Sequence, residues 1–267
     1  MDKNIIDLHV HIFPEKVSEK ARKNLEQRHG MRFISDPDLD SLKRYMDLND
    51  IATAVIQPVA ISTIQAKSIN DWLLGLVSKD ESIKAFGACY PDGKDMGESL
   101  KKFKQCGING IKLHPDYQHF YPDDNTLFDL YEHIIMNDMW VLFHAGLGSG
   151  NSNRIYSSTV RFLNLRKKYP ELKIILAHLG GYRNWSASKK ELIGKDFYMD
   201  LSYTFGILED HKIKEMIRLH GPNKIVFGSD FPLYRSRDNL KMFLNLDLDD
   251  KDRKDILYNN AKKDILL

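Results

Sequence analysis

The sequence predicts an α/β fold in which residues 1–267 form a single (β/α)8 TIM barrel domain. Short runs rich in Val, Ile and Phe alternate with longer amphipathic segments, which is typical of parallel strands joined by helices. The runs number eight, and the length of 267 residues is close to the roughly 250 that are typical of such a barrel. An open doubly wound sheet is the alternative, but no GxGxxG motif follows the first run.

The expected strands share a short apolar core, and most of them end in a polar or charged residue. They cover residues 4–11, 53–57, 84–90, 108–114, 140–144, 173–178, 197–202 and 224–230. Helices are expected where apolar residues recur at intervals of three and four, in residues 36–50, 125–138, 157–170 and 208–222. The longest irregular segments, residues 12–37 and 145–153, both follow strands, as the active-site loops of a barrel do.

Composition excludes several classes of protein. The formal net charge is +2 with both signs scattered along the chain, so we expect no nucleic-acid partner. The two cysteines, Cys89 and Cys106, do not form a CxxC motif, which argues against a thiolate metal site. No apolar run reaches the ~20 residues of a membrane span, and no signal-peptide pattern precedes the first strand. We therefore expect a cytoplasmic protein with a small-molecule substrate and no membrane partner, whose outer helices offer surface for a homo-oligomer.

A pair of histidines closes the first expected strand, in the stretch IIDLHVHIFP. Because side chains alternate between the two faces of a strand, His9 and His11 point the same way. Two imidazoles at one strand end can share a metal ion. Asp7 is expected on the same face but deeper in the barrel, where it would support the two histidines.

Four more expected strands end in side chains that bind metals or carry protons. Their ends read GIKLHP, VLFHAG, ILAHLGG and VFGSDFP, and they supply Lys112, His114, His144, His178 and Asp230. In a barrel, the C-terminal ends of the strands converge on one mouth. Histidine nitrogens and a carboxylate are the ligands that a divalent ion such as Zn²⁺ prefers. We therefore expect a divalent ion at this mouth, with zinc as the first expectation.

The motifs HVH, GIKLHP, FHAG, AHLGG and FGSDFP, in this order, resemble the amidohydrolase superfamily over essentially the whole chain. The last two motifs are similar to its amidohydrolase-related branch (amidohydrolase 2), which includes decarboxylases of aminocarboxymuconate semialdehyde and of hydroxybenzoates. The resemblance implies a barrel with one or two divalent metals at its mouth. His9, His11 and Asp230 would hold the first ion, and His144 and His178 would hold a second ion or divide between ligand and acid–base roles.

The resemblance also implies a metal-dependent hydrolase that acts on a small amide, cyclic amide or ester through a metal-activated water. Asp230 would take the proton of that water, and His178 or Lys112 would help to stabilise the oxyanion. In two-metal members of the superfamily, a lysine on the fourth strand can be carboxylated and bridge both ions, and Lys112 lies on the matching strand. Decarboxylase members usually lack this lysine. Lys112 therefore favours hydrolysis over the alternative, a nonoxidative metal-dependent decarboxylase of an aromatic or unsaturated carboxylic acid.

Other assignments remain open at the level of the sequence. An unmodified Lys112 could bind a substrate carboxylate, and the loop arginines Arg183 and Arg235 could clamp one bidentately. His114 either contacts the substrate or shapes the loop that follows it, and Asp200 is expected to support the metal ligands. A deoxyribonuclease of the TatD type would usually carry a glutamate on the strand of Lys112. A non-enzymatic binding barrel would leave the ligand positions unfilled.

Overall fold

The computed structural model describes residues 4–91, 96–148 and 155–267, apart from the side chains of Arg28 and His29. Its named strands pair in parallel and fall into two hydrogen-bonded groups. The first group contains β1 (Ile6–Val10), β2 (Thr53–Ile56) and β3 (Ile83–Ala85). The second group contains β4 (Gly87–Ala88), β5 (Gly110–Leu113), β6 (Trp140–Phe143), β7 (Lys173–Leu176), β8 (Tyr198–Asp200) and β9 (Ile225–Val226).

Backbone hydrogen bonds join the two groups into a closed ring. Phe86 alone separates β3 from β4, and its N–H donates to the carbonyl of Ile56 at 2.9 Å. On the other side, the N–H of Asp230 donates to the carbonyl of His9 at 2.8 Å. The predicted barrel is therefore confirmed, and β3 with β4 occupies the one strand that the sequence predicts at residues 84–90. The last predicted strand is shorter than expected, because only β9 is regular, and after it Phe231 forms a single isolated bridge with Val10 of β1.

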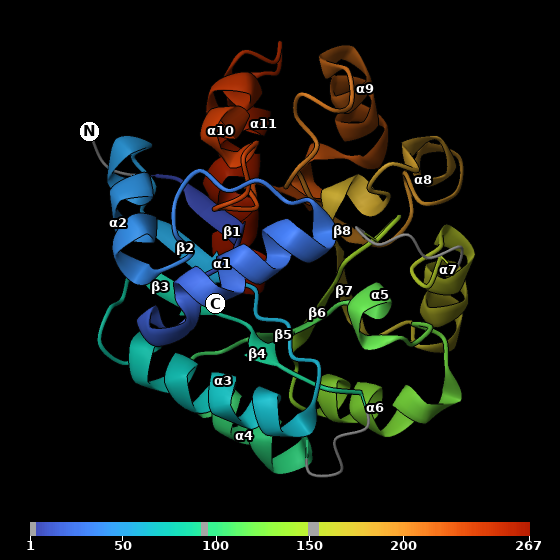
Figure 1. The fold of residues 1–267 in the computed structure, drawn as a ribbon. Helices are drawn as coiled ribbons and strands as arrows, with labels where there is room; N and C mark the ends of the chain where they lie inside the picture. The colour runs from blue at the N-terminus through green and yellow to red at the C-terminus, as the bar shows by residue number, and fades with distance from the viewer. Residues whose placement is uncertain (1–3, 92–95, 149–154) are drawn as a thin grey trace.

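Helices surround the strands (Figure 1). Four of them lie within the predicted helical segments: α2 (Leu39–Leu48), α6 (Phe128–Met136), α7 (Thr159–Lys168) and α9 (Asp210–His220). The others are α3 (Thr63–Val77), α4 (Met96–Gln105), α5 (Pro115–Gln118), α8 (Trp185–Glu191), α10 (Ser236–Leu244) and α11 (Asp250–Lys254) together with α1, described below. Wide helical turns over Asp255–Asn259 and Ala261–Ile265 complete the chain.

The prediction that residues 12–37 are irregular is wrong, because α1 (Glu15–His29) lies within them. This helix is rich in charged residues, and its apolar residues are only Val17, Ala21 and Leu25, so its hydrophobic periodicity is weak. Arg22 Nε donates to Asp36 Oδ1 at 2.6 Å and so attaches α1 to the chain that follows it. In Figure 1, α1 crosses in front of the strands. In the second segment predicted as irregular, residues 149–153 lie outside the described residues.

A bulge in β1 turns His9 into the barrel. Asp7 pairs with Ala54 and Val10 pairs with Ile56. Between these two pairs β1 therefore has two residues where β2 has one. An extra residue of this kind bends the strand and changes the direction of its side chains. The prediction that Asp7 shares the face of His9 is therefore wrong, although His9 and His11 do point the same way.

Apolar side chains fill both sides of the barrel wall. The interior is packed by a cluster that includes Leu8, Val55, Phe86, Leu142, Ile175 and Val226. A larger cluster fills the space between the second group of strands and its helices, and another lies between β1–β3 and α2 and α3. This packing holds the strand ends in fixed positions.

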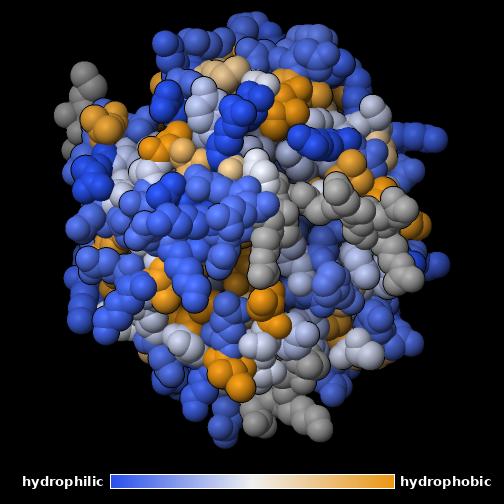
Figure 2. All heavy atoms as spheres, viewed as in Figure 1, coloured by the Kyte–Doolittle hydropathy of each residue, from blue (hydrophilic) through white to orange (hydrophobic). Residues whose placement is uncertain are grey.

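The outer surface is mainly hydrophilic. Figure 2 shows hydrophilic side chains over most of the face in view, with separate hydrophobic patches between them. The most exposed apolar side chains include Leu48, Ile64 and Met136, which lie on three different helices. Within the part of the chain that the structure describes, no helix is both long and apolar enough to span a membrane.

The interior packing predicts the effect of adding a single methyl group. A Cβ atom at Gly110 in β5 would lie 2.6 Å from two ring carbons of Phe86, which is fully buried. Gly110→Ala should lower the free energy of unfolding by about 1–3 kcal/mol, because the core must shift to relieve the overlap. Gly75→Ala is the matched control, since Gly75 lies in α3 with no atom near its Cβ position, and it should stabilise by ~0.5–1 kcal/mol. Urea denaturation measures both, and a Gly110→Ala protein as stable as the unmodified chain would contradict this packing.

Candidate metal centre and active site

Three side chains meet where β1 and the segment after β9 lie side by side. His9 Nε2 and His11 Nε2 are 3.2 Å apart, and Asp230 Oδ1 lies 3.1 Å from His11 Nε2 and 3.6 Å from His9 Nε2. One donor atom from each residue lies within 4.8 Å of the other two. Two imidazole nitrogens and a carboxylate oxygen at this spacing suit a divalent ion. The residues present therefore fit the metal centre that the sequence predicts.

Asp230 reaches this centre through an uncommon backbone conformation. Its φ is +66°, in the left-handed region that residues other than glycine seldom adopt. The hydrogen bond from its N–H to the carbonyl of His9 fixes this conformation against β1. Burial would raise the pKa of the Asp230 carboxyl, but the hydrogen bond from His11 and the charges of the nearby histidines hold that pKa below its usual range. Asp230 is therefore a carboxylate that attracts a cation into the centre.

Lys112 lies beside the centre, at the end of β5. Its Nζ is 3.3 Å from His9 Nε2, and the side chain is almost completely buried. Burial lowers the pKa of the Lys112 ammonium to about 8, and the charges of Asp200 and Asp230 oppose this shift. Lys112 therefore lies next to His9, and its roles as a metal ligand and as a carboxylated bridge stay predictions.

His144 and His178 form a second pair, and the ring of His178 stacks on that of His9 at a centroid distance of 5.5 Å. His144 Nδ1 lies 3.1 Å from His178 Nε2. The other nitrogens face carbonyl oxygens: His144 Nε2 faces that of Leu147 at 3.1 Å, and His178 Nδ1 faces that of Ser202 at 2.8 Å. Since a carbonyl only accepts, two neutral rings would present lone pairs to each other across the gap. The gap therefore suits a shared proton or a cation, and the predicted roles of this pair stay predictions.

His114 shapes the loop after β5. Its ring lies between those of Tyr117 and His144, with centroid distances of 3.9 Å and 4.1 Å. Its Nδ1 accepts from the N–H of Tyr117 at 3.4 Å, and its N–H donates to Gln118 Oε1 at 2.8 Å. Burial, followed by the charge of His144, lowers the pKa of His114 well below its usual value, so the ring is neutral. The loop-shaping role is present, and substrate contact by His114 stays a prediction.

Two arginines and two tyrosines from three loops lie near Asp230. The guanidinium carbon of Arg183 is 5.4 Å from the ring centre of Tyr182, and the rings of Tyr182 and Tyr203 are 5.8 Å apart. Burial raises the pKa of both tyrosines, and the charge of Asp230 acts in the same direction, whereas Arg183 and Arg235 act against it. Among the described residues, neither arginine has a carboxylate partner within 4.0 Å. Two cations without an anionic partner therefore lie near the metal centre.

The sequence interpretation does not include Ser202, whose hydroxyl contacts two histidines of the site. Ser202 closes the predicted strand 197–202, so the rule that identifies the other strand-end residues also points to it. Tyr182 is another omission, although it directly precedes Arg183. The expected support from Asp200 is present, because its Oδ2 accepts from His9 Nδ1 at 2.7 Å.

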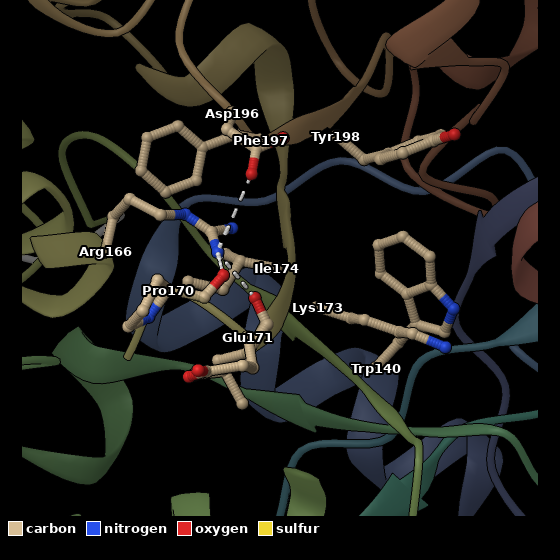
Figure 3. Close-up of a pocket in the computed structure, with 10 residues that line it drawn as sticks. Trp140, Arg166, Pro170, Glu171, Lys173, Ile174, Asp196, Phe197 and Tyr198 are labelled. Carbon is tan, nitrogen blue, oxygen red and sulfur yellow. Dashed lines mark hydrogen bonds and ion pairs between the residues drawn. The ribbon is translucent and has the colours of Figure 1, made fainter. Parts of the chain in front are cut away.

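A separate hollow lies at the other end of the barrel, where β6, β7 and β8 begin (Figure 3). Arg166 lines this hollow and donates to the carbonyls of Pro170 and Leu172, each at 2.9 Å. Its guanidinium carbon lies 5.1 Å from the ring centre of Phe197. Arg166 therefore holds a loop in place, at the end of the barrel opposite to the candidate metal centre.

A closed parallel barrel with histidines and a carboxylate gathered at its C-terminal strand ends defines a metal-dependent barrel enzyme. The chain belongs to the amidohydrolase 2 family, because the family model described as "Amidohydrolase" matches residues 6–263. This finding confirms the family resemblance of the strand-end motifs. A search of proteins with curated functions gives no significant match.

Solved structures share the fold over nearly the full chain. A dihydroxybenzoic acid decarboxylase from Polaromonas sp. JS666 with bound manganese and 2-nitroresorcinol is 20% identical, with coverage of 97% of this chain and 96% of that chain and a TM-score of 0.73. A 5-carboxyvanillate decarboxylase from Novosphingobium aromaticivorans DSM 12444, complexed with manganese and a nitrobenzoic acid, is 15% identical, with coverages of 99% and 96% and a TM-score of 0.75. A protein from Acinetobacter baumannii, described as a probable 2-pyrone-4,6-dicarboxylic acid hydrolase, is 16% identical, with coverages of 97% and 98% and a TM-score of 0.70.

The buried carboxyl of Asp7 predicts a pH dependence of stability. Its Oδ1 accepts from the N–H groups of Ser229 at 2.9 Å and His9 at 3.2 Å, and its Oδ2 is buried with no partner among the described residues. Burial raises the pKa of Asp7 from 3.8 to about 7. Between these values the folded chain holds a proton that the unfolded chain releases, so this contribution to stability is lost as the pH rises to about 7.

Asp7→Asn removes this titration while it keeps an oxygen for both N–H groups. Relative to the unmodified chain, the variant should gain about 2–3 kcal/mol in its free energy of unfolding as the pH rises from about 5 to about 8. Urea denaturation of both proteins across this range measures the difference. A difference that stays constant with pH would show that folded Asp7 holds no more protons than unfolded Asp7 in this range, and would contradict the raised pKa.

Proposed function

We propose that the protein is a metal-dependent enzyme that removes CO2 from an aromatic carboxylic acid without an oxidant. The observation that carries this proposal is the pair Arg183 and Arg235, which have no carboxylate partner within the described part of the chain and lie next to the tyrosine rings near Asp230. Guanidinium groups bind carboxylates, and aromatic side chains pack against aromatic substrates. The relatives with manganese are decarboxylases of aromatic acids, which supports the same class of substrate.

His9, His11 and Asp230 would hold the metal. A divalent ion supplies a Lewis acid that polarises a substrate oxygen. We expected zinc, whereas the two decarboxylases above contain manganese, and two imidazoles with a carboxylate suit either ion. The choice of ion and the number of ions therefore stay part of the proposal.

In this reaction, residues of the chain must deliver one proton to the substrate. When the bond between the ring carbon and the carboxylate breaks, its electron pair stays on the ring carbon, CO2 leaves, and the carbon takes a proton. We assign proton delivery to His178, whose Nε2 faces His144 across a gap that suits a shared proton. Asp230 has a depressed pKa, so it is ionised at neutral pH and has no proton to donate. Arg183 and Arg235 would bind and orient the acid.

Hydrolysis of a small carboxylated ester or amide is the second candidate. The observation in its favour is Lys112, a buried amine 3.3 Å from His9 Nε2 on the strand where hydrolases of the superfamily carry a lysine. In this reaction Asp230 would take a proton from water, and Lys112 or His178 would stabilise the oxyanion. The relative described as a probable hydrolase acts on a dicarboxylic acid by its name, so the arginines are compatible with this candidate too.

The two candidates predict different products. The protein loaded with Mn²⁺ should release CO2 from 2,6-dihydroxybenzoate or 5-carboxyvanillate, the acids of two structurally similar decarboxylases. In D2O the product should carry deuterium on the ring carbon that bore the carboxylate. The measurement is mass spectrometry of the products, with 2-pyrone-4,6-dicarboxylate as the hydrolase probe and H2¹⁸O as the solvent label. Incorporation of ¹⁸O into a product without release of CO2 would replace the first candidate by the second.

Two variants act as controls for this assay. Asp230→Asn should abolish turnover of either kind while the barrel stays folded, because both reactions use its carboxylate. Arg235→Gln should raise KM by roughly 10-fold or more, since a charged hydrogen bond to the substrate carboxylate is worth about 1.5–3 kcal/mol. An unchanged KM would remove Arg235 from the substrate site.

A further inference from the structure

Asp200, at the end of β8, accepts hydrogen bonds from four donors inside the barrel. Its Oδ1 accepts from the N–H of His178 at 2.9 Å, from the N–H of Ser202 at 2.9 Å and from Ser202 Oγ at 2.5 Å. Its Oδ2 accepts from His9 Nδ1 at 2.7 Å. Asp200 and Ser202 are both fully buried, so no water competes for these contacts.

The Ser202 hydroxyl has only one proton, and the short contact to Asp200 uses it. Ser202 Oγ can therefore only accept in its two other contacts, with His9 Nδ1 at 3.1 Å and His178 Nδ1 at 2.8 Å. The carbonyl of Ser202 also accepts from His178 Nδ1. Every acceptor around these two Nδ1 atoms thus requires a proton on the imidazole.

We propose that Asp200 and Ser202 form a positioning hub that fixes His9 and His178 in the tautomer with the proton on Nδ1. Each ring then presents the lone pair of Nε2 to the mouth, His9 toward His11 and Asp230, and His178 toward His144. One hub therefore orients a metal ligand from β1 and a proton carrier from the loop after β7. The inference rests on the metal ligands of the proposed function, but its direct readout is independent of activity.

The two acceptors differ in what their removal would do. Of the two acceptors around His9 Nδ1 that the structure describes, the Asp200 carboxylate is the stronger, because it is charged and Ser202 Oγ is the longer contact at 3.1 Å. His178 keeps the carbonyl of Ser202 in any side-chain variant. Loss of the Asp200 charge should therefore change His9 and leave the tautomer of His178 in place. Partners that orient metal-binding histidines typically contribute 10–100-fold to metal affinity.

The first test needs no variant. In the metal-free protein labelled with ¹⁵N-histidine, at a pH where both rings are neutral, ¹⁵N NMR should show protonated Nδ1 and unprotonated Nε2 for His9 and His178. A proton on Nε2 of either neutral ring would overturn the proposal. Metal-free protein is the right sample, because a bound ion would itself impose the tautomer.

The second test is Asp200→Asn, which keeps the shape of the side chain. Its amide oxygen can serve the three donors that face Oδ1, so its NH2 group faces His9 Nδ1 and requires that nitrogen to accept. The NMR should then show the His9 proton moved to Nε2, inside the metal centre, and the Kd for Mn²⁺ should rise 10–100-fold. Asp7→Asn is the matched control, since Asp7 accepts from the backbone N–H of His9 and not from its ring, and the variant should keep both the tautomer of His9 and the Kd.

The outcomes separate this inference from the proposed function. A variant that keeps the proton on Nδ1 of His9 and an unchanged Kd would overturn the hub. A His9 proton moved to Nε2 together with an unchanged Kd would support the hub and contradict His9 as a metal ligand. If the unmodified protein does not decarboxylate the probe acids, the proposed function fails, but the NMR result on the tautomers still stands. Should the variant not fold, the measurement on the unmodified protein still tests the proposal.

Discussion

Closure of the barrel between β1 and the segment after β9 is the constraint on which the candidate site depends. The hydrogen bond from the N–H of Asp230 to the carbonyl of His9 joins two strands that are remote in the sequence. It brings a carboxylate to a pair of imidazoles and holds Asp230 in a left-handed conformation. The bulge in β1 completes the arrangement, because it turns His9 inward. Backbone geometry therefore places all three donor atoms before any ion binds.

The mouth of the barrel balances buried charges of both signs. Asp200 and Asp230 are anions, since hydrogen bonds and nearby histidines hold the pKa of each below its usual range although burial would raise it. Burial lowers the pKa of His9 to about 4, with a further contribution from Lys112, so His9 is a neutral ligand at physiological pH. An unpaired carboxylate in such a site is costly, and a divalent ion relieves that cost. The same excess of negative charge explains why a cationic Lys112 is tolerated there.

Much of this arrangement could be predicted from the sequence, because parallel strands appear in it as short apolar runs, and the C-terminal ends of such strands meet at one mouth of the barrel. That rule brings His9, His11 and Asp230 to the mouth together with other strand-end residues, and the family resemblance selects these three as the first metal site. The rule fails where hydrogen bonds between distant segments decide the backbone. Nothing local marks the bulge that turns Asp7 away from His9, and no glycine marks the left-handed conformation of Asp230. Helix α1 was missed for another reason, since its apolar residues are few and its charged residues outnumber them. Ser202 lay within reach of the rule, and the chemistry of a serine gave no reason to single it out.

The most direct test of this account is the metal content of the protein after reconstitution with Mn²⁺ and removal of the excess, measured by mass spectrometry of the elements alongside His11→Ala. His11 is the most exposed of the three ligands, with 27% of its side chain accessible, so its truncation perturbs the barrel least. The account predicts at least one ion per chain in the unmodified protein and a loss of that ion in the variant. An unmodified protein that binds no ion, or a variant that retains the full content, would contradict a metal centre at His9, His11 and Asp230.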